Sequence, residues 1–518
     1  MRRLYPKGFR SADDLAIIRR ILSPRRIIVP LLVVLALARL PGTGWLIRSH
    51  FHVLTDHTLP VHGSGLSESS DPSFDYLTAG GGKSFLTTPA LAKLVQNCPD
   101  DYQVQVGAAL LQPGAGEGPV NIQVKVIRDL ESRFSGRPAL RAHEIAAIVG
   151  QCTIPKLEED WLLSGDAPPS AKAGPAGVDM AGLGRAAARG EEMDADNAFF
   201  PMITAYCLFA EHRDREAMDA VLRAGQKNRW DSYFQDSARA AVGLTPRLEG
   251  RVPSARRFAI FEISTEAQEP LVGLIRTVSR AAVWNAILNE QHGGRDAELR
   301  YRAAIMGVGS RMRVQSPSLI ENLVGVSLVR VCLVRPGGAP TEPRRPKVDT
   351  EIALQQRLDR YCDYLQRTGH ASDVLWVRTE MNRGAVVHEI TNCALKTTSW
   401  LKPFIASLVT WILSFSLFVC FVSTAAGMIL GSLIPKSWRL KRRRAPLRAR
   451  QLRGIRFIFG FFVLLIYLYP ILVLYAAHVD TQASQAFDRM LTYEGSYVAA
   501  SVHREWPGPP DASAGRQP

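Results

Sequence analysis

The residues of this 518-residue chain best suited to covalent chemistry are its seven cysteines. No two of them have the C-x-x-C spacing, which excludes the common zinc and thiol-redox motifs. Cys98 and Cys152 fall at the ends of two predicted helices, and we expect this pair to form a disulfide bond if that part of the chain faces an oxidising compartment. The alternative is that the cysteines are small, buried apolar residues.

The familiar catalytic and cofactor-binding motifs are missing from the sequence. It contains no G-x-S-x-G, no H-E-x-x-H and no Rossmann glycine pattern. The stretch Gly80–Ser84 is similar to the end of a phosphate-binding loop, but Leu77 occupies the position of its first glycine. The sequence therefore predicts no catalytic residue, metal ligand or cofactor. It favours a protein that is not an enzyme.

Three small residues spaced four apart, Ser423, Gly427 and Gly431, lie in a long apolar run. Such spacing puts them on one face of a helix and lets another membrane helix approach closely. The partner is either another span of this chain or a helix of a second protein. We therefore predict a helix-packing face here.

A dense basic stretch follows that run. Residues 436–456 contain no acid and ten basic residues, which are Lys436, Arg439, Lys441, Arg442, Arg443, Arg444, Arg448, Arg450, Arg453 and Arg456. Short loops of this kind stay on the cytoplasmic side of a membrane. This loop and the basic first 26 residues account for the net charge of +15, so the rest of the chain is close to neutral. That distribution excludes a basic nucleic-acid-binding face.

Three apolar segments are candidates for membrane spans. Residues 404–434 and 457–478 flank the basic loop and carry no Asp, Glu, Lys or Arg, and each is long enough to cross a bilayer. Residues 27–47 form an earlier apolar segment, interrupted by Arg39. We interpret it as an uncleaved anchor. A signal peptide cleaved after Ala36-Leu37-Ala38 is the alternative, and it would leave the same domain outside.

These features predict a mainly helical protein with three transmembrane helices and a large extracytoplasmic domain. The predicted order is a basic cytoplasmic N-terminus (1–26), the first span (27–47), a small helical subdomain with an N-terminal loop (48–163), a flexible Ala/Gly/Pro-rich linker (164–190), a larger helical subdomain (191–400), the second span (404–434), the basic cytoplasmic loop (435–456), the third span (457–478) and an extracytoplasmic tail (479–518).

Hydrophobic periodicity predicts the helices of the outer domain. In the small subdomain we expect helices over 101–112, 120–134 and 139–151, after one that begins at Pro89. In the larger subdomain we expect 265–290, 294–313, 317–334, 348–368 and 371–381. Glu321, Asn322 and Arg330 interrupt the apolar segment 317–334, which favours a buried core helix over a fourth span.

Residues 198–231 predict two helices broken near residues 211–214. Small and apolar residues alternate at the spacing of a helical hairpin, at Ala205, Leu208, Ala217, Val221 and Ala224. This stretch resembles one tetratricopeptide-type unit. His212 replaces the usual turn glycine, and Arg229 stands where a proline would end the unit. The following residues do not repeat the pattern, so a generic helical hairpin is the alternative.

The leading functional hypothesis is a multi-pass inner-membrane scaffold or assembly protein. Its extracytoplasmic domain would bind other envelope proteins, its spans would contact membrane lipid, and a homo-oligomer is a further option. One alternative is a non-catalytic subunit of a membrane transport or secretion complex, joined through the face at Ser423. The other is an extracytoplasmic enzyme whose site has no recognised motif.

Overall fold

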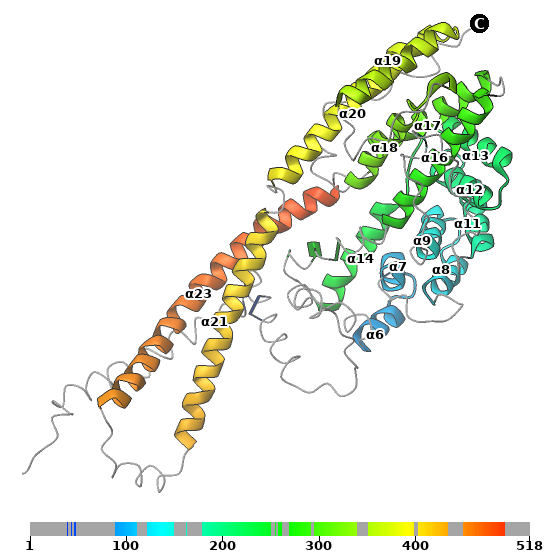
Figure 1. Ribbon diagram of the computed structural model, residues 1–518. Coiled ribbons are helices and arrows are strands. Elements are labelled where there is room, and N and C mark those ends of the chain that lie inside the picture. Colours follow the sequence, from blue (N-terminus) through cyan, green and yellow to red (C-terminus); the bar gives the residue numbers. More distant parts are fainter. Residues whose placement is uncertain are drawn as a thin grey trace, which may run out of the picture. The chain divides into compact units, whose positions relative to one another are not determined.

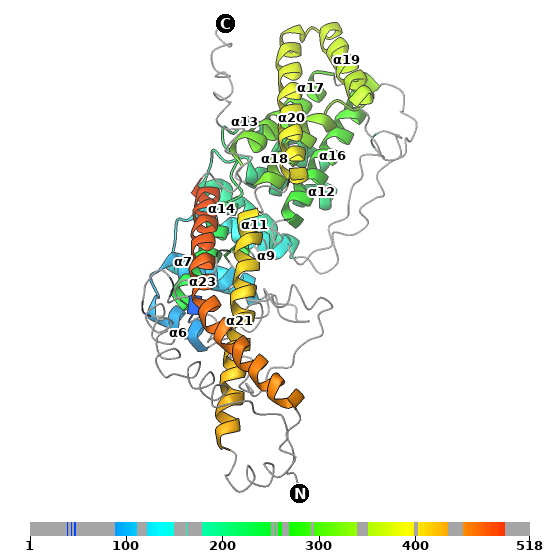
Figure 2. The same cartoon turned by 90° about the vertical axis from the view of Figure 1, so that its left-hand side faces the viewer.

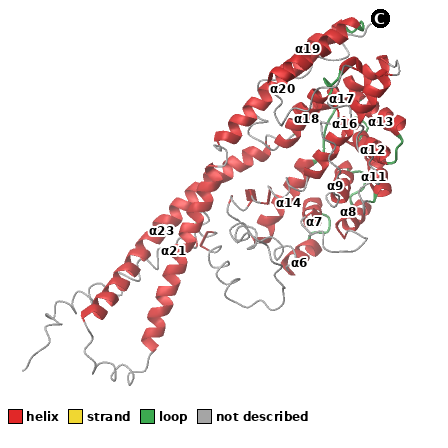
Figure 3. Cartoon of the chain, viewed as in Figure 1, coloured by secondary structure: helices red, strands yellow, loops and turns green. Residues whose placement is uncertain are grey.

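The computed structural model describes residues 89–110, 122–149, 179–249, 269–291, 295–316, 318–338, 351–397, 402–433 and 449–492, together with Arg39, Thr43, Leu46, Ile47, Leu162, Ser254, Arg257, Phe258, Ile260 and Phe261. Two compact units share the chain. Unit 1 comprises Met1–Gly80, Glu249–Phe258 and Leu401–Ala486, and unit 2 comprises Gly81–Leu248, Ala259–Trp400 and Phe487–Pro518. The described elements are helices (Figure 3). This confirms the prediction of a mainly helical chain.

The described part of unit 2 begins with helices α6 (Pro89–Asn97), α7 (Tyr102–Leu110), α8 (Ile122–Arg133) and α9 (Pro138–Val149) (Figure 1). These bounds match the predicted helices to within two residues or so. Gln105 is buried and its amide Nε2 donates to the carbonyl oxygens of Val95 and Cys98, at 2.8 and 2.9 Å. The amide thereby satisfies the Val95 carbonyl group at the end of α6 and adds a second donor to the Cys98 carbonyl oxygen, which also accepts from the backbone N–H of Asp101.

Helix α11 (Met180–Met193) begins inside the predicted flexible linker (164–190) and occupies its C-terminal part, 180–190. Asp179 caps its first turn by accepting a hydrogen bond from the backbone N–H of Gly182, at 2.7 Å. Leu183, Ala186 and Ala187 on this helix are buried. The part of 164–190 from Asp179 onwards is therefore ordered and contributes to the core. Gly190 lets α11 pack closely against Phe200 of the next helix, because a Cβ at this position would lie 2.2 Å from the Phe200 ring.

Helices α12 (Phe199–Ala210) and α13 (Asp214–Gln226) pack as a hairpin, as predicted. His212 lies in the turn with φ 58°, the left-handed conformation that a turn glycine adopts. The backbone N–H groups of His212 and Arg213 donate to the carbonyl oxygens of Phe209 and Leu208 at 3.1 and 2.9 Å, which closes the end of α12 as a Schellman motif. A helical hairpin is thus present, and membership of a tetratricopeptide-type family stays a prediction.

The chain continues with α14 (Phe234–Glu249). The centre of unit 2 consists of α16 (Glu269–Gln291), α17 (Arg295–Gln315) and α18 (Leu319–Val331), which pack on one another, with the short turn η1 (Pro336–Gly338) after them. Helices α17 and α18 cross at two glycines. A Cβ at Gly309 would lie 2.7 Å from the carbonyl oxygen of Gly325, and one at Gly325 would lie 2.5 Å from that of Gly309. The crossing therefore brings one backbone directly against the other.

Helices α19 (Glu351–Arg367) and α20 (Ala371–Thr397) form a second hairpin of unit 2 (Figure 2). Helix α20 extends well beyond the predicted 371–381. Its buried residue Glu380 accepts a hydrogen bond from Arg313 of α17, at 2.6 Å between Nη2 and Oε2. Because both side chains are about 1% exposed, the ion pair joins the hairpin to the centre of unit 2 from the inside.

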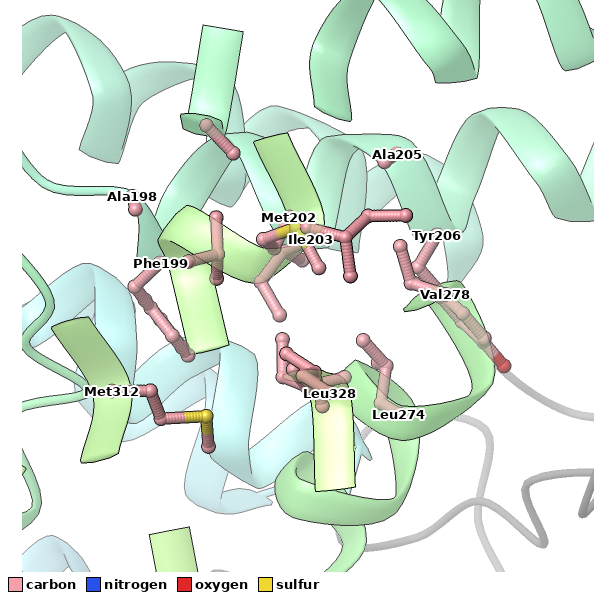
Figure 4. Packing of buried hydrophobic residues seen from close by; sticks show 14 of the residues in the cluster. Ala198, Phe199, Met202, Ile203, Ala205, Tyr206, Leu274, Val278, Met312 and Leu328 are labelled. Atoms are coloured by element: carbon pink, nitrogen blue, oxygen red, sulfur yellow. The ribbon is translucent and has the colours of Figure 1, made fainter. Parts of the chain in front are cut away.

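A single hydrophobic cluster extends from Tyr102 on α7 to Met381 on α20. In its middle, Met202 and Ile203 of α12 lie opposite Leu274 of α16 and Leu328 of α18 (Figure 4). The helices that the sequence divides between two subdomains therefore share one core. Helix α18 is buried among them, as predicted for residues 317–334.

Two helices in the described residues have the length and apolar composition needed to cross a membrane. One is Pro270–Gln291 within α16, where 56% of the apolar window is buried. The other is Lys402–Cys420 within α21 (Lys402–Leu433), where only 28% is buried. Burial assigns α16 to the core of unit 2. Helix α21 keeps its apolar surface exposed and coincides with the predicted second span.

Candidate functional site

Unit 1 contains an antiparallel pair of long helices, α21 and the part of α23 (Ala449–Thr492) up to Ala486, which lie alongside each other in Figures 1 and 2. Helix α23 covers the whole predicted third span and continues through Pro470. The Phe418 and Tyr469 rings are 5.9 Å apart, and Ser407 and Asp480 are hydrogen-bonded. Ser407 precedes Phe418 by eleven residues on α21, and Asp480 follows Tyr469 by eleven residues on α23. Both contacts therefore fit one antiparallel register.

Buried positions recur on both helices in steps of three and four residues. Those on one face are Phe404, Ser407, Thr410, Ser414 and Phe418 on α21, and Tyr469, Val473, Ala476, Asp480 and Ala483 on α23. This spacing places each set along one helical face, as in a coiled-coil seam. Leu46 and Ile47, at the end of the predicted first span, are buried in the same cluster. Three separate parts of the chain thus meet in unit 1.

Asp480 is the centre of a polar cluster in this seam. Its carboxylate Oδ1 accepts hydrogen bonds from the backbone N–H of Ser254 at 2.7 Å and from the hydroxyl of Ser407 at 2.9 Å. The Ser254 hydroxyl donates to the Asp480 carbonyl oxygen at 3.1 Å. Arg257 donates to the hydroxyl of Ser484, one turn further along α23, at 3.1 Å. We call Ser254, Arg257, Ser407, Asp480 and Ser484 the Asp480 cluster.

An aromatic contact also joins the segment that contains Ser254 to the helix pair. Phe258 stacks on Phe404 of α21 with ring centroids 4.5 Å apart. Buried carboxylates are costly unless they are fully hydrogen-bonded, and Asp480 is only 3% exposed. These contacts therefore hold Ser254, Arg257 and Phe258, which lie between α14 and α16 in the sequence, against the helices of the pair.

The outer surface of the α21–α23 pair is apolar. Ten large side chains on it are between 41% and 64% exposed, and they are Ile405, Val409, Ile412, Leu413, Leu464, Tyr467, Leu468, Ile471, Leu474 and Tyr475. Monomeric soluble proteins rarely expose so many large apolar residues together. We call these ten residues the apolar belt. It is the surface that lipid would cover if the pair lies in a membrane.

The predicted helix-packing residues lie on α21. Ser423 is exposed, and Gly427 and Gly431 are helical. Of the basic residues, Arg450, Arg453 and Arg456 belong to the first turns of α23, and Lys436, Arg439, Lys441, Arg442, Arg443, Arg444 and Arg448 lie outside the described residues. For the predicted disulfide, Cys98 is a half-buried free thiol and Cys152 lies outside the described residues.

A second buried polar centre, which sequence reasoning missed, lies inside unit 2. The Arg302 guanidinium donates to the Glu298 carboxylate at 2.6 Å and to the carbonyl oxygens of Cys332 and Val334 at 2.6 and 2.8 Å. Burial beside a second carboxylate, Glu290, raises the pKa of Glu298 to about 8. Arg302 and both glutamates have side chains at most 2% exposed, so this centre cannot reach a substrate and acts in packing.

A third polar centre joins the two ends of the α12–α13 hairpin. Asn197 is fully buried; its Oδ1 accepts from the backbone N–H groups of Phe199 and Asp231, and its Nδ2 donates to the Asp231 carbonyl oxygen. Arg229 pairs with Asp194 and Asp231. Arg229 therefore ends the hairpin by tying it to the preceding loop, where a tetratricopeptide unit would use proline.

None of these centres has the composition of a metal site. Groups of three or more His, Cys, Asp or Glu side chains that could hold a metal ion are not found within the described residues. Comparison of the chain with protein-family models, with curated proteins and with solved structures finds no match. The contacts of the chain itself are therefore the basis for a functional proposal.

Proposed function

We propose that this chain is a membrane-anchored helical scaffold of the inner membrane, whose unit 2 lies outside the cytoplasm and binds other envelope proteins. The apolar belt of α21 and α23 is the observation that carries the proposal. Leaving such side chains half exposed to water costs about 1 kcal/mol each, which a lipid environment removes. The predicted span at 27–47 is the third membrane helix of this proposal.

The orientation rests on the basic loop between α21 and α23. Carrying its cations across the membrane is unfavourable, so the loop stays in the cytoplasm. Both helices then lead back to the other side, where unit 2 lies. The Asp480 cluster supports this arrangement, because a buried carboxylate next to the end of a span is tolerated when it is hydrogen-bonded within the protein.

The scaffold role rests on how unit 2 is built. Its polar centres at Arg302 and Asn197 are closed inside helical packing, which suits a rigid body that presents helical surfaces. Among its exposed large apolar residues are Ile352 on α19 and Leu375 on α20, at 70% and 76% exposure. We expect partner proteins to cover positions of this kind.

Photo-crosslinking in intact cells tests the scaffold role. A photoreactive amino acid replaces Leu375 in one full-length variant, Ile352 in a second, and the exposed residue Arg215 of α13 in a control. We expect discrete protein adducts from position 375 or 352 that are missing from position 215. If both apolar positions give only the background of the control, partner binding through the α19–α20 hairpin is refuted.

A second candidate function is a non-catalytic subunit of a transport or secretion complex. The observation that favours it is the exposure of Ser423, the first of the three small residues on α21, because small residues allow another helix to approach closely. Replacing Gly427 with leucine would then block co-purification of the partner from detergent extracts. Unchanged recovery would remove this candidate and leave the scaffold proposal intact.

A further inference from the structure

Helices α8, α9 and α11 of unit 2 line an open pocket of about 280 Å³. Arginines and glutamates dominate its lining, which includes Arg128, Glu131, Arg141, Glu144, Arg185 and Arg189. The pocket is slightly smaller than the sites that hold drug-sized ligands. Its size and lining suit a small, charged molecule.

The glutamates of the pocket are already paired with the arginines of α8 and α9. Glu144 accepts from Arg128 at 2.5 Å and from Arg141 at 2.8 Å. Glu131 pairs with Arg141. These ion pairs neutralise each other and leave the two arginines of α11 to set the charge of the pocket.

Arg185 and Arg189 lie one turn apart on α11, so both line the same side of the pocket. Both are exposed, and within the described residues no carboxylate pairs with either of them. Two like charges at this spacing repel each other. No acidic side chain of the described residues offsets that repulsion. A bound anion would offset it.

Arg141 also lines the pocket and carries an unsatisfied donor. Its side chain is only 6% exposed, and its Nε is buried without a hydrogen-bond partner in the described part of the chain. A buried guanidinium N–H without an acceptor is unfavourable, so a small shift of the Arg141 side chain that brings it to an acceptor on a ligand would stabilise it. Three separate arginines thus offer donors to the same space.

We propose that this pocket binds a small polyanion, a molecule with two or more carboxylate or phosphate groups, through Arg185, Arg189 and Arg141. Guanidinium groups recognise both kinds of anion by paired N–H···O hydrogen bonds. The two α11 arginines hold the outer anionic group, and Arg141 donates to the inner one. This site is independent of the scaffold role and of the membrane orientation.

Calorimetric titration of the full-length protein in detergent at low ionic strength tests the proposal, with citrate and inorganic pyrophosphate as probes and chloride as the monovalent comparison. We expect saturable binding of at least one polyanion and none of chloride. Alanine at Arg185 or at Arg189 should weaken binding at least tenfold. Arg189→Lys should weaken it less, because lysine keeps the positive charge but cannot donate two parallel hydrogen bonds to one anionic group.

The control is Arg215→Ala, which removes an exposed arginine from α13 that does not line the pocket and should leave binding unchanged. Both α11 arginines are exposed, so their variants should keep the unfolding temperature of the parent without ligand. The proposal is overturned if neither polyanion gives a saturable signal, or if binding persists equally in the Arg185 and Arg189 variants.

Discussion

Ser407 of α21 donates a hydrogen bond to the carboxylate of Asp480 of α23 across 2.9 Å, and both side chains are buried between the helices. The same carboxylate oxygen accepts the backbone N–H of Ser254, which precedes Asp480 by 226 residues in the sequence. One carboxylate thus joins three segments of unit 1. Its removal should loosen all three attachments at once.

The first prediction concerns Asp480→Ala. Since each hydrogen bond to a charged acceptor contributes about 1.5–3 kcal/mol, we expect this change to destabilise unit 1 by about 3 kcal/mol. Limited proteolysis of the full-length protein in detergent, with cleavage sites mapped by mass spectrometry, should reveal new cleavage near Ser254. The exposed neighbour Gln482→Ala is the control and should leave the digestion pattern unchanged. Identical patterns for both variants would contradict the role of the Asp480 cluster.

The second prediction is a pH dependence of stability that arises at Glu298. Burial raises the pKa of this carboxyl to about 8 in the folded protein, above its ordinary value of 4.5. The folded state therefore holds a proton that the unfolded chain releases, so this stabilisation is complete below pH 4.5 and is lost as the pH rises through about 8. We expect unfolding by urea to become easier for this reason between these pH values.

Comparison with Glu298→Gln isolates the effect of that one group. Glutamine stays neutral at every pH, so the variant should lose less stability than the parent between pH 6 and pH 8 in urea titrations. Arg302 is expected to keep its pairing with Glu290 in the variant. If the parent and the variant lose equal stability over this range, Glu298 does not hold the proton.

The third prediction concerns the crossing of α17 and α18. An alanine at Gly325 would place a methyl group 2.5 Å from the Gly309 carbonyl oxygen and 2.6 Å from the Arg313 backbone nitrogen. Backbone atoms cannot move aside cheaply, so we expect Gly325→Ala to destabilise unit 2 by about 1–3 kcal/mol. The matched control is Gly273→Ala on α16, where a Cβ meets nothing within 4 Å.

Chemical denaturation monitored by tryptophan fluorescence measures both glycine variants. Gly273→Ala should raise stability by up to about 1 kcal/mol, because alanine favours helix more than glycine does. Opposite signs for the two variants are the expected result. A Gly325→Ala protein as stable as the Gly273→Ala protein would show that the helices do not cross at these residues.

The fourth prediction concerns the turn residue His212. A left-handed conformation costs a residue with a side chain about 1–2 kcal/mol, and glycine avoids most of this cost but loses more chain entropy on folding. We therefore expect His212→Gly to stabilise unit 2 by about 0.5–1 kcal/mol in thermal unfolding. His212→Ala keeps the strained conformation and should give no gain. A gain of equal size with alanine would mean that the histidine side chain itself is unfavourable.

The sequence predicted the helices wherever apolar residues recur at helical spacing. The predicted segments 265–290, 294–313 and 317–334 correspond to α16, α17 and α18. Helix α11 was interpreted as a linker because its Ala/Gly-rich sequence offers few large apolar side chains. Its packing comes from its neighbours, since Phe200 lies against Gly190. The composition of α11 alone cannot reveal that a large side chain from another helix fills the space beside its small residues.

The polar centres were beyond prediction for a different reason. Asp480 meets Ser254 and Ser407 only after the chain has folded, and Arg302 of α17 donates to the carbonyl oxygens of Cys332 and Val334 and pairs with Glu290 of α16. A single sequence carries no signal for pairs so far apart. The α21–α23 pair was predicted because length and apolar composition are local properties, whereas its register depends on tertiary contacts.

The central claim is that α21 and α23 cross a membrane with the basic loop in the cytoplasm and unit 2 on the other side. The most direct test inserts a reporter enzyme that is active only outside the cytoplasm into the full-length chain, either after Ala445 in the loop or after Gly369 in the turn between α19 and α20. We predict an inactive reporter at the first position and an active one at the second. Activity at the first position with none at the second would contradict the account.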